Sequence, residues 1–281
     1  MIQVDTKLEV FRRMCLIRYF ELEAKKAYEA GHIKPPIYLS VGQESIASAL
    51  SVVCKDYYIL AQHRAHSVYL AFGGNPEKLI DELLGLPTGC TKGLGGSPSI
   101  QSDEIKMIGH HGLIGENVPL AVGVALGSGD RTLCIFGDGA AEEDYILPSM
   151  GFAQTHGLPV LFVCEDNNLS ILTEKSVRRN WEMSELARSM GMLSFDIEDD
   201  PQDILKCAEM CVKILPAFIN IRTCRHLWHA GAGIDNKPAW DRFTLVAEQL
   251  VSHGGLEQSD CIQTETQEYV RKLWAERLQK L

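Results

Sequence analysis

The sequence predicts an α/β fold with a mostly parallel central sheet and helices on both faces. The runs 131–136 and 159–164 are short, apolar and partly β-branched, which is typical of buried parallel strands. A segment of helix length, 145–156, separates them and completes a right-handed βαβ unit. The 281 residues are 46% hydrophobic and contain no obvious linker or internal repeat, so we expect a single domain over residues 1–281.

The first part of the chain predicts two helices and a strand. Residues 8–30 carry apolar side chains at intervals of three and four, and Gly31 follows where a helix should end. An extended segment, 37–39, precedes a second helix expected over 42–53. The run 57–61 is typical of a buried strand.

The alternation of helices and strands continues toward the C-terminus. A helix is expected over 177–189 and a short strand over 192–197. An amphipathic helix over 201–214 and a strand over 217–221 follow. This order predicts that further parallel strands join the same sheet.

Charge and cysteine content exclude several classes of function. A net charge of -10 without a basic stripe argues against nucleic acid and anionic membranes as partners. The nine cysteines are dispersed through apolar segments without a CxxC pair, which indicates reduced core thiols. No signal or transit pattern begins the chain, and no run approaches the roughly 20 apolar residues that span a bilayer. We therefore expect a cytoplasmic protein.

An Asp and an Asn stand just beyond the two central strands. Asp138 lies in a GDGA turn after the first strand, and Asn167 follows the second. The carboxyl ends of parallel strands meet at one edge of the sheet, where ligands of open α/β sheets bind. Mg²⁺ prefers such oxygen ligands together with phosphate oxygens, and the glycines beside Asp138 allow a diphosphate to approach the backbone. The spacing favours a magnesium diphosphate site over an ordinary turn.

The segment 62–66, QHRAH, follows the strand expected at 57–61. We assign Arg64 to the diphosphate, because a guanidinium offers two donors in one plane and keeps its charge. We expect His66 to be catalytic, although it could instead cap a helix or order a neighbouring loop.

Several segments together resemble the alpha subunit of the thiamine diphosphate-dependent decarboxylase component of 2-oxo acid dehydrogenase complexes, the pyruvate, branched-chain and acetoin dehydrogenase group. They are the GDGA turn, LPVLFVCEDN, the GQE trio at 42–44, the Gly-rich loop at 86–99 and the GHHGLIGENVPLAVGVAL segment at 109–126. The resemblance runs from about Leu8 to about His229. It implies a thiamine diphosphate-binding fold with thiamine diphosphate and Mg²⁺ as cofactors.

The resemblance also implies roles for particular residues. The family's metal ligands correspond to Asp138, Asn167 and the carbonyl of Leu169, if Asp166 and Asn167 are aligned with its paired Asn. The main chain of Gly112 and Ile114 would hold the aminopyrimidine ring. The remaining cofactor-binding positions lie near the ends of strands: His63, Arg64, Gly139, Ala140 and His229.

His229 aligns with the active-site His of the family, in the segment TCRHLWH at 223–229. An imidazole with a pKa near 6.5 suits proton exchange at neutral pH, so we expect His229 to be catalytic as well as cofactor-binding. A structural loop histidine is the alternative.

The resemblance implies an enzyme that acts on a small 2-oxo acid or an acetoin-like ketone and passes an acyl group to a lipoyl acyltransferase. The pyrimidine-side Glu would come from a beta subunit, which implies an α2β2 assembly. Departures such as Tyr38 and His63 at pocket positions keep a second enzyme class open: a carboligase or ketol transferase, similar to a split transketolase, in sugar or natural-product biosynthesis. A catalytically inactive scaffold is the third hypothesis, and the substrate itself stays open.

Overall fold

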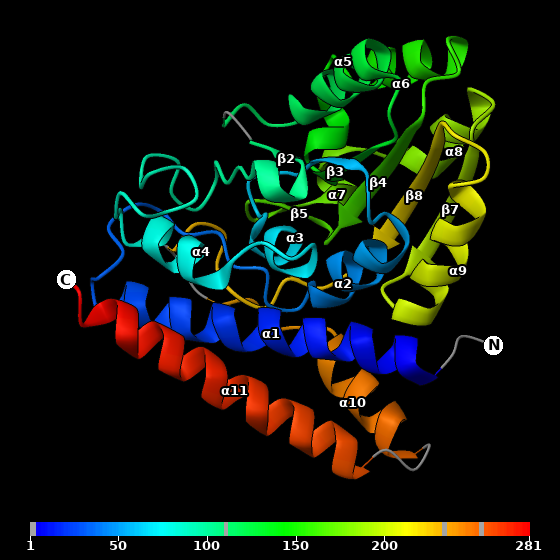
Figure 1. The fold of residues 1–281 in the computed structure, drawn as a ribbon. Coiled ribbons are helices and arrows are strands. Elements are labelled where there is room, and N and C mark those ends of the chain that lie inside the picture. Colours follow the sequence, from blue (N-terminus) through cyan, green and yellow to red (C-terminus); the bar gives the residue numbers. More distant parts are fainter. Residues whose placement is uncertain (1–3, 110–111, 232–234, 253–255) are drawn as a thin grey trace.

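Six parallel strands form the central sheet in the computed structural model, which describes residues 4–109, 112–231, 235–252 and 256–281. Their order across the sheet is β2-β1-β3-β4-β8-β7 (Figure 1). The strands are β1 Tyr58–Leu60, β2 Met107–Ile108, β3 Thr132–Gly137, β4 Val160–Asp166, β7 Leu193–Glu198 and β8 Ala217–Arg222. The predicted fold class is confirmed, and β3 and β4 are central as expected.

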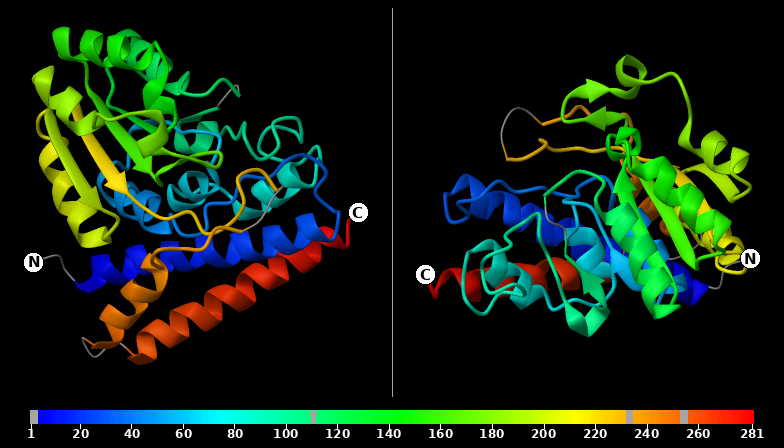
Figure 2. Two further views of the ribbon diagram at one scale, coloured as in Figure 1. Left: turned by 180° about the vertical axis from the view of Figure 1, so that it is seen from behind. Right: turned by 90° about the horizontal axis from the view of Figure 1, so that it is seen from above.

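Alternate side chains of each strand enter two different apolar clusters, because successive residues of a strand point to opposite faces. Leu133 and Ile135 of β3 pack with α1 (Val4–Glu29), α2 (Glu44–Val53) and α9 (Pro201–Cys211). Cys134 and Phe136 pack with α5 (Asn117–Ser128), α6 (Ile146–Thr155) and α8 (Met183–Ser189) on the other face. Helices therefore cover both faces, as Figures 1 and 2 show.

The smaller elements lie mostly in the connections. They are α3 His66–Ala71, α4 Pro76–Leu83, η1 Asp103–Ile105, η2 Ala140–Glu142, the β5 Leu169–Ser170 and β6 Thr173–Glu174 hairpin, and α7 Lys175–Arg178. The helix expected over 177–189 is broken between α7 and α8. Arg179 adopts an extended conformation there, and its guanidinium donates to the Asp138 carbonyl at 2.6 Å, so a tertiary contact interrupts the helix.

The start of α2 explains the glycine at position 42. The helix begins at Glu44 rather than at residue 42, and Gly42 has a φ of 98°. A Cβ atom at Gly42 would lie 2.0 Å from the Cys224 carbonyl oxygen, so the loop after β8 approaches too closely for any side chain.

Beyond residue 229, a region for which we made no prediction, the structure describes two helices, α10 Arg242–Ser252 and α11 Leu256–Leu278. α11 runs along α1, and the rings of Phe20 and Trp274 lie 5.5 Å apart (Figure 2). In the described part of the chain, no helix combines the length and apolarity needed to cross a membrane. The single-domain boundary and the cellular compartment stay predictions.

Candidate cofactor site

A cavity of about 160 Å³ lies at the carboxyl ends of β1, β3 and β4. Most of the predicted site residues line it: His63, Arg64, Ile114, Asp138, Gly139, Ala140, Asn167, Leu169 and His229. Segments from distant parts of the sequence therefore meet where the parallel strands end. Gly137, one of the two glycines beside Asp138, also lines it, and the remaining lining residues carry no prediction from the sequence: Gln62, Gly115, Ser170, Ile171 and Arg225.

Two predicted residues are not among those that line the cavity. Gly112 lies in an exposed turn two residues before Ile114 and has a φ of 99°. Residues 110 and 111 of the same resembling segment lie outside the described residues. His66 is fully buried, with Nδ1 2.9 Å from Glu21 Oε2 and Nε2 2.9 Å from Ser97 Oγ. Because both ring nitrogens have partners, this geometry favours the loop-ordering alternative, while a catalytic role stays a prediction.

One side of the cavity presents oxygen atoms. Asp138 is 1% exposed, and the Asn167 side-chain oxygen lies beside the Leu169 main chain, whose N–H donates to it at 3.1 Å. Asn167 in turn donates to Gln43 Oε1 at 3.1 Å, which fixes the orientation of the amide. A carboxylate, an amide oxygen and a main-chain carbonyl form a hard donor set that suits Mg²⁺. Among the described residues, no cluster of three or more His, Cys, Asp and Glu could hold a metal, so a cation here would need the amide and carbonyl oxygens.

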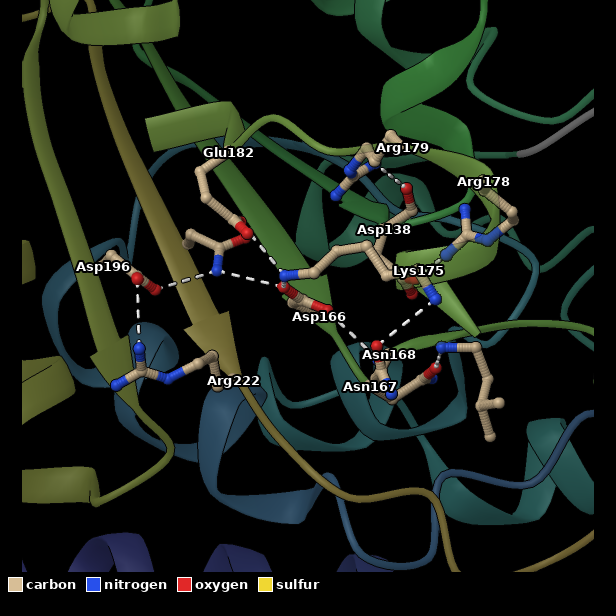
Figure 3. A network of polar contacts seen from close by, with 12 residues as sticks. Asp138, Asp166, Asn167, Asn168, Lys175, Arg178, Arg179, Glu182, Asp196 and Arg222 are labelled. Carbon is tan, nitrogen blue, oxygen red and sulfur yellow. Dashed lines mark hydrogen bonds and ion pairs between the residues drawn. The ribbon is translucent and has the colours of Figure 1, made fainter. Parts of the chain in front are cut away.

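Basic side chains of α7 neutralise this acidic edge, as Figure 3 shows. Arg178 bonds the Asp138 carboxylate, and Lys175 Nζ donates to Asp166 Oδ2 at 2.8 Å. Burial and the neighbouring Asp166 raise the pKa of Asp138, which Arg178 opposes. Burial also acts to raise the pKa of Asp166, but the hydrogen bond and charge of Lys175 together with hydrogen bonds from Asn220 and the Asn168 N–H outweigh it, and the pKa falls below its usual value.

Two buried arginine side chains also line the cavity. Arg64 and Arg225 are 3% and 2% exposed, and neither forms an ion pair with a carboxylate within the described residues. Arg64 donates to the Leu39 carbonyl at 2.6 Å, and Arg225 donates to the Ile171 carbonyl at 2.7 Å. Among the residues that the structure describes, the buried Nε of Arg225 has no hydrogen-bond partner. Two desolvated positive charges with an orphaned donor are suited to an anion.

These charges determine the protonation state of His229. Burial and the nearby Arg64 and Arg225 lower its pKa to about 4. Its Nδ1 lies 3.5 Å from Arg64 Nη2 and 3.4 Å from Arg225 Nη1. A guanidinium can only donate, so Nδ1 accepts and the proton of the neutral ring resides on Nε2. His229 is therefore a hydrogen-bond donor at neutral pH.

We expect His229→Gln to reduce the loss of stability that acid causes. The unfolded chain binds a proton at His229 near its ordinary pKa of 6.5, whereas the folded chain binds it only near 4. Stability is thus lost as pH falls through this window, and the variant lacks this contribution. The thermal midpoint of the variant, measured relative to that of wild type, should therefore be about 2–4 °C higher at pH 5 than at pH 7.5. The exposed His156→Gln is the control, and parallel curves for His229→Gln would contradict the protonation assignment.

The family described as dehydrogenase E1 component matches residues 12–214. The chain belongs to this family. It is 30% identical over 238 residues to the pyruvate dehydrogenase E1 component subunit alpha of Rickettsia bellii, an alignment that covers 79% of this chain and 72% of that protein. It is 33% identical over 172 residues to the mitochondrial pyruvate dehydrogenase E1 component subunit alpha-1 of Arabidopsis thaliana, which covers 59% of this chain and 44% of that protein.

The solved structure of transketolase from Campylobacter jejuni shares the fold, with a TM-score of 0.62 and 16% identity. The likeness covers 99% of this chain and 49% of the transketolase chain, so this chain spans about half of that protein. The dehydrogenase E1 family confirms the resemblance inferred from the sequence and the predicted enzyme class, the alpha subunit of a thiamine diphosphate-dependent 2-oxo acid dehydrogenase.

Arg225 is the main site residue that carries no prediction from the sequence. It lies four residues before His229 in the same TCRHLWH segment, but nothing in that segment alone indicates that its side chain reaches the cavity. Gln62 directly precedes His63 and Arg64, and its amide donates to the buried Glu165 at 2.5 Å. Arg178 likewise had no signal in the sequence, because its contact with Asp138 depends on how α7 folds back over the sheet.

Proposed function

We propose that the chain holds the diphosphate of thiamine diphosphate with Mg²⁺ and acts, with a beta-type partner, on a small 2-oxo acid or an acetoin-like ketone. The observation that carries this proposal is the polarity of the cavity. The buried Asp138 and the half-buried Asn167 line it together with the buried Arg64 and Arg225. A diphosphate bound to a divalent cation matches this distribution of charge.

Each side chain has a defined task in this proposal. Asp138, Asn167 and the Leu169 carbonyl hold the metal, and Arg64 and Arg225 bind phosphate oxygens. Thiamine diphosphate, when bound, supplies the electron sink for breaking a bond next to a ketone carbonyl. His229 donates from Nε2 to a phosphate or substrate oxygen, since its Nδ1 faces the two guanidinium groups. The neutral ring adds a donor without adding another positive charge.

Exposed apolar side chains around the cavity support a partner subunit. Ile114 and Ile171 line the cavity and are 38% and 58% exposed, and their chain neighbours Leu113 and Leu172 are 62% and 67% exposed. An apolar rim around a polar cavity is typical of a surface that another protein covers. We propose a beta subunit in an α2β2 assembly as that protein, with a lipoyl acyltransferase as a further partner.

The test is cofactor binding by the chain coexpressed with a beta-type partner. Titration calorimetry should show binding of thiamine diphosphate in the presence of Mg²⁺ and none in the presence of EDTA. The heat should be lost when an excess of free diphosphate competes for the same site. Binding of equal strength without a divalent cation would contradict the metal assignment.

A carboligase or ketol transferase is the second candidate, and a cluster of three rings favours keeping it. The Tyr38 ring lies 4.7 Å from His63 and 5.5 Å from His229, and Tyr38 and His63 are the two positions of this cluster where the chain departs from the resembling family. A panel of 2-oxo acids with an artificial electron acceptor separates the two reactions. Bond formation with an aldehyde and no reduction of the acceptor would favour the carboligase.

A further inference from the structure

One carboxylate organises the Gly-rich loop at 89–97. Glu82, near the end of α4, is 1% exposed, and the loop folds around it. Each of its oxygens accepts two main-chain N–H groups: Oε2 from Thr91 at 2.7 Å and Gly93 at 2.9 Å, and Oε1 from Gly95 and Gly96 at 2.9 Å each. Burial opposes ionisation, but hydrogen bonds from Thr91, Gly93 and Gly96 outweigh it and lower the pKa of Glu82. The loop thus closes around a charged group.

The glycines of this loop are necessary for that closure. Gly93 and Gly96 have φ of 74° and 58°, a conformation that glycine adopts without strain. A Cβ atom at Gly89 would lie 2.5 Å from Glu82 Oε2. A Cβ atom at Gly93 would lie 2.5 Å from the Gly85 carbonyl carbon, so close packing of the loop on Glu82 and on its own backbone accounts for these glycines.

Ser97 connects the end of this loop to the cavity. It is 2% exposed, and its Oγ accepts from the Tyr38 N–H at 2.9 Å and lies 2.9 Å from His66 Nε2. From the other side, Glu21 accepts from the Ser40 N–H at 2.8 Å and bonds His66 Nδ1. The short segment 38–40 is therefore held at both ends by buried polar groups.

Segment 38–40 in turn contacts the groups that bind the cofactor in the proposed function. The Leu39 carbonyl accepts from Arg64 Nη1 at 2.6 Å, and the Tyr38 ring packs against His63 and His229. A shift of this segment would displace the Arg64 guanidinium and the His229 ring together. The path from Glu82 to the cavity consists of hydrogen bonds and ring contacts without a gap.

We propose that Glu82 is a positioning residue for the cofactor site. Its carboxylate folds the loop, the loop places Ser97, and Ser97 holds segment 38–40 against Arg64 and His229. The effect of Glu82 on cofactor binding rests on the proposed function. Its effect on the order of the loop does not, because the loop folds around Glu82 without any ligand.

Glu82→Gln tests the proposal in the complex with the beta-type partner. In either orientation the amide keeps one accepting oxygen and turns an NH₂ group toward two N–H donors. We expect hydrogen exchange in 91–96 and at Tyr38 to become about tenfold faster, and the dissociation constant of thiamine diphosphate to rise about fivefold. Glu77→Gln is the matched control, because Glu77 lies on the same helix but pairs with Arg277.

Ser97→Ala separates the loop from the cavity. Exchange at 91–96 should stay slow, whereas exchange at Tyr38 should become faster and cofactor binding should weaken as in Glu82→Gln. Unchanged exchange at 91–96 in Glu82→Gln would overturn the proposal, and so would a loosened loop with the same cofactor affinity as Glu77→Gln. If the wild-type complex binds no thiamine diphosphate, the proposed function fails. In that case the hydrogen exchange rates at 91–96 and at Tyr38 still show whether Glu82 orders the loop and segment 38–40.

Discussion

Asp138→Asn is expected to weaken Mg²⁺-dependent binding of thiamine diphosphate by about 1000-fold, or about 4 kcal/mol. Asp138 is the only charged member of the proposed oxygen set, since Asn167 and Leu169 contribute neutral oxygens. An amide of the same shape keeps one weak ligand atom but removes the negative charge that attracts the cation. Titration of the complex with thiamine diphosphate at fixed Mg²⁺, and Mn²⁺ binding followed by electron paramagnetic resonance, measure the loss.

A matched control separates this effect from a general loss of acidity. Asp130 lies exposed in the turn just before β3, the strand that ends at Asp138, and Asp130→Asn should bind both ligands like wild type. Asp138→Asn should still fold, because Arg178 keeps its ion pair with Glu142 and burial disfavours the charged form of Asp138. Retention of Mn²⁺ binding in a folded Asp138→Asn variant would remove Asp138 from the metal site.

The sequence was sufficient to predict that Asp138 and Asn167 lie close together, because this depends on a single rule about adjacent parallel strands. Each residue follows a short, fully apolar run, and adjacent parallel strands joined by one helix end at the same edge. The pairing of β3 with β4 supplies that geometry directly. Arg64 follows by the same rule, because β1 pairs with β3 on the other side.

Arg225 depends on information that local patterns do not contain. β8 lies between β4 and β7, out of chain order, and this insertion brings the loop after β8 beside Asn167 and Ile171. A sequence in which β7 paired with β4 would show the same periodicity and would place Arg225 farther away. Strand order depends on the packing of whole layers, so the second guanidinium of the cavity could not be derived from spacing alone.

The break between α7 and α8 illustrates a different limit. The segment 177–189 has helical periodicity, but the extended Arg179 donates to the Asp138 carbonyl and pairs with Glu142. Hydrogen bonds to charged groups contribute more than the small helix propensity of one or two residues. Tertiary contacts at the site therefore override the local preference.

Arg64→Gln is expected to weaken thiamine diphosphate binding by about 100-fold without destabilising the ligand-free chain. Burial and Arg225 lower the pKa of Arg64 to about 10, so the group stays charged at neutral pH while desolvated. Within the described residues its hydrogen bonds are to the Leu39 carbonyl and to His229, without a carboxylate. Glutamine keeps a polar side chain with a donor and removes the uncompensated charge.

This opposite response of binding and stability distinguishes a ligand-binding Arg from a structural one. A structural Arg in a buried ion pair would leave an unpaired carboxylate when replaced, and the thermal midpoint would fall. Scanning calorimetry of the ligand-free complex should instead show an unchanged or higher midpoint for Arg64→Gln. Arg222→Gln, at the exposed end of β8, should leave affinity unchanged. A lower midpoint with full affinity would assign Arg64 to the fold, and the anion would then depend on Arg225 alone.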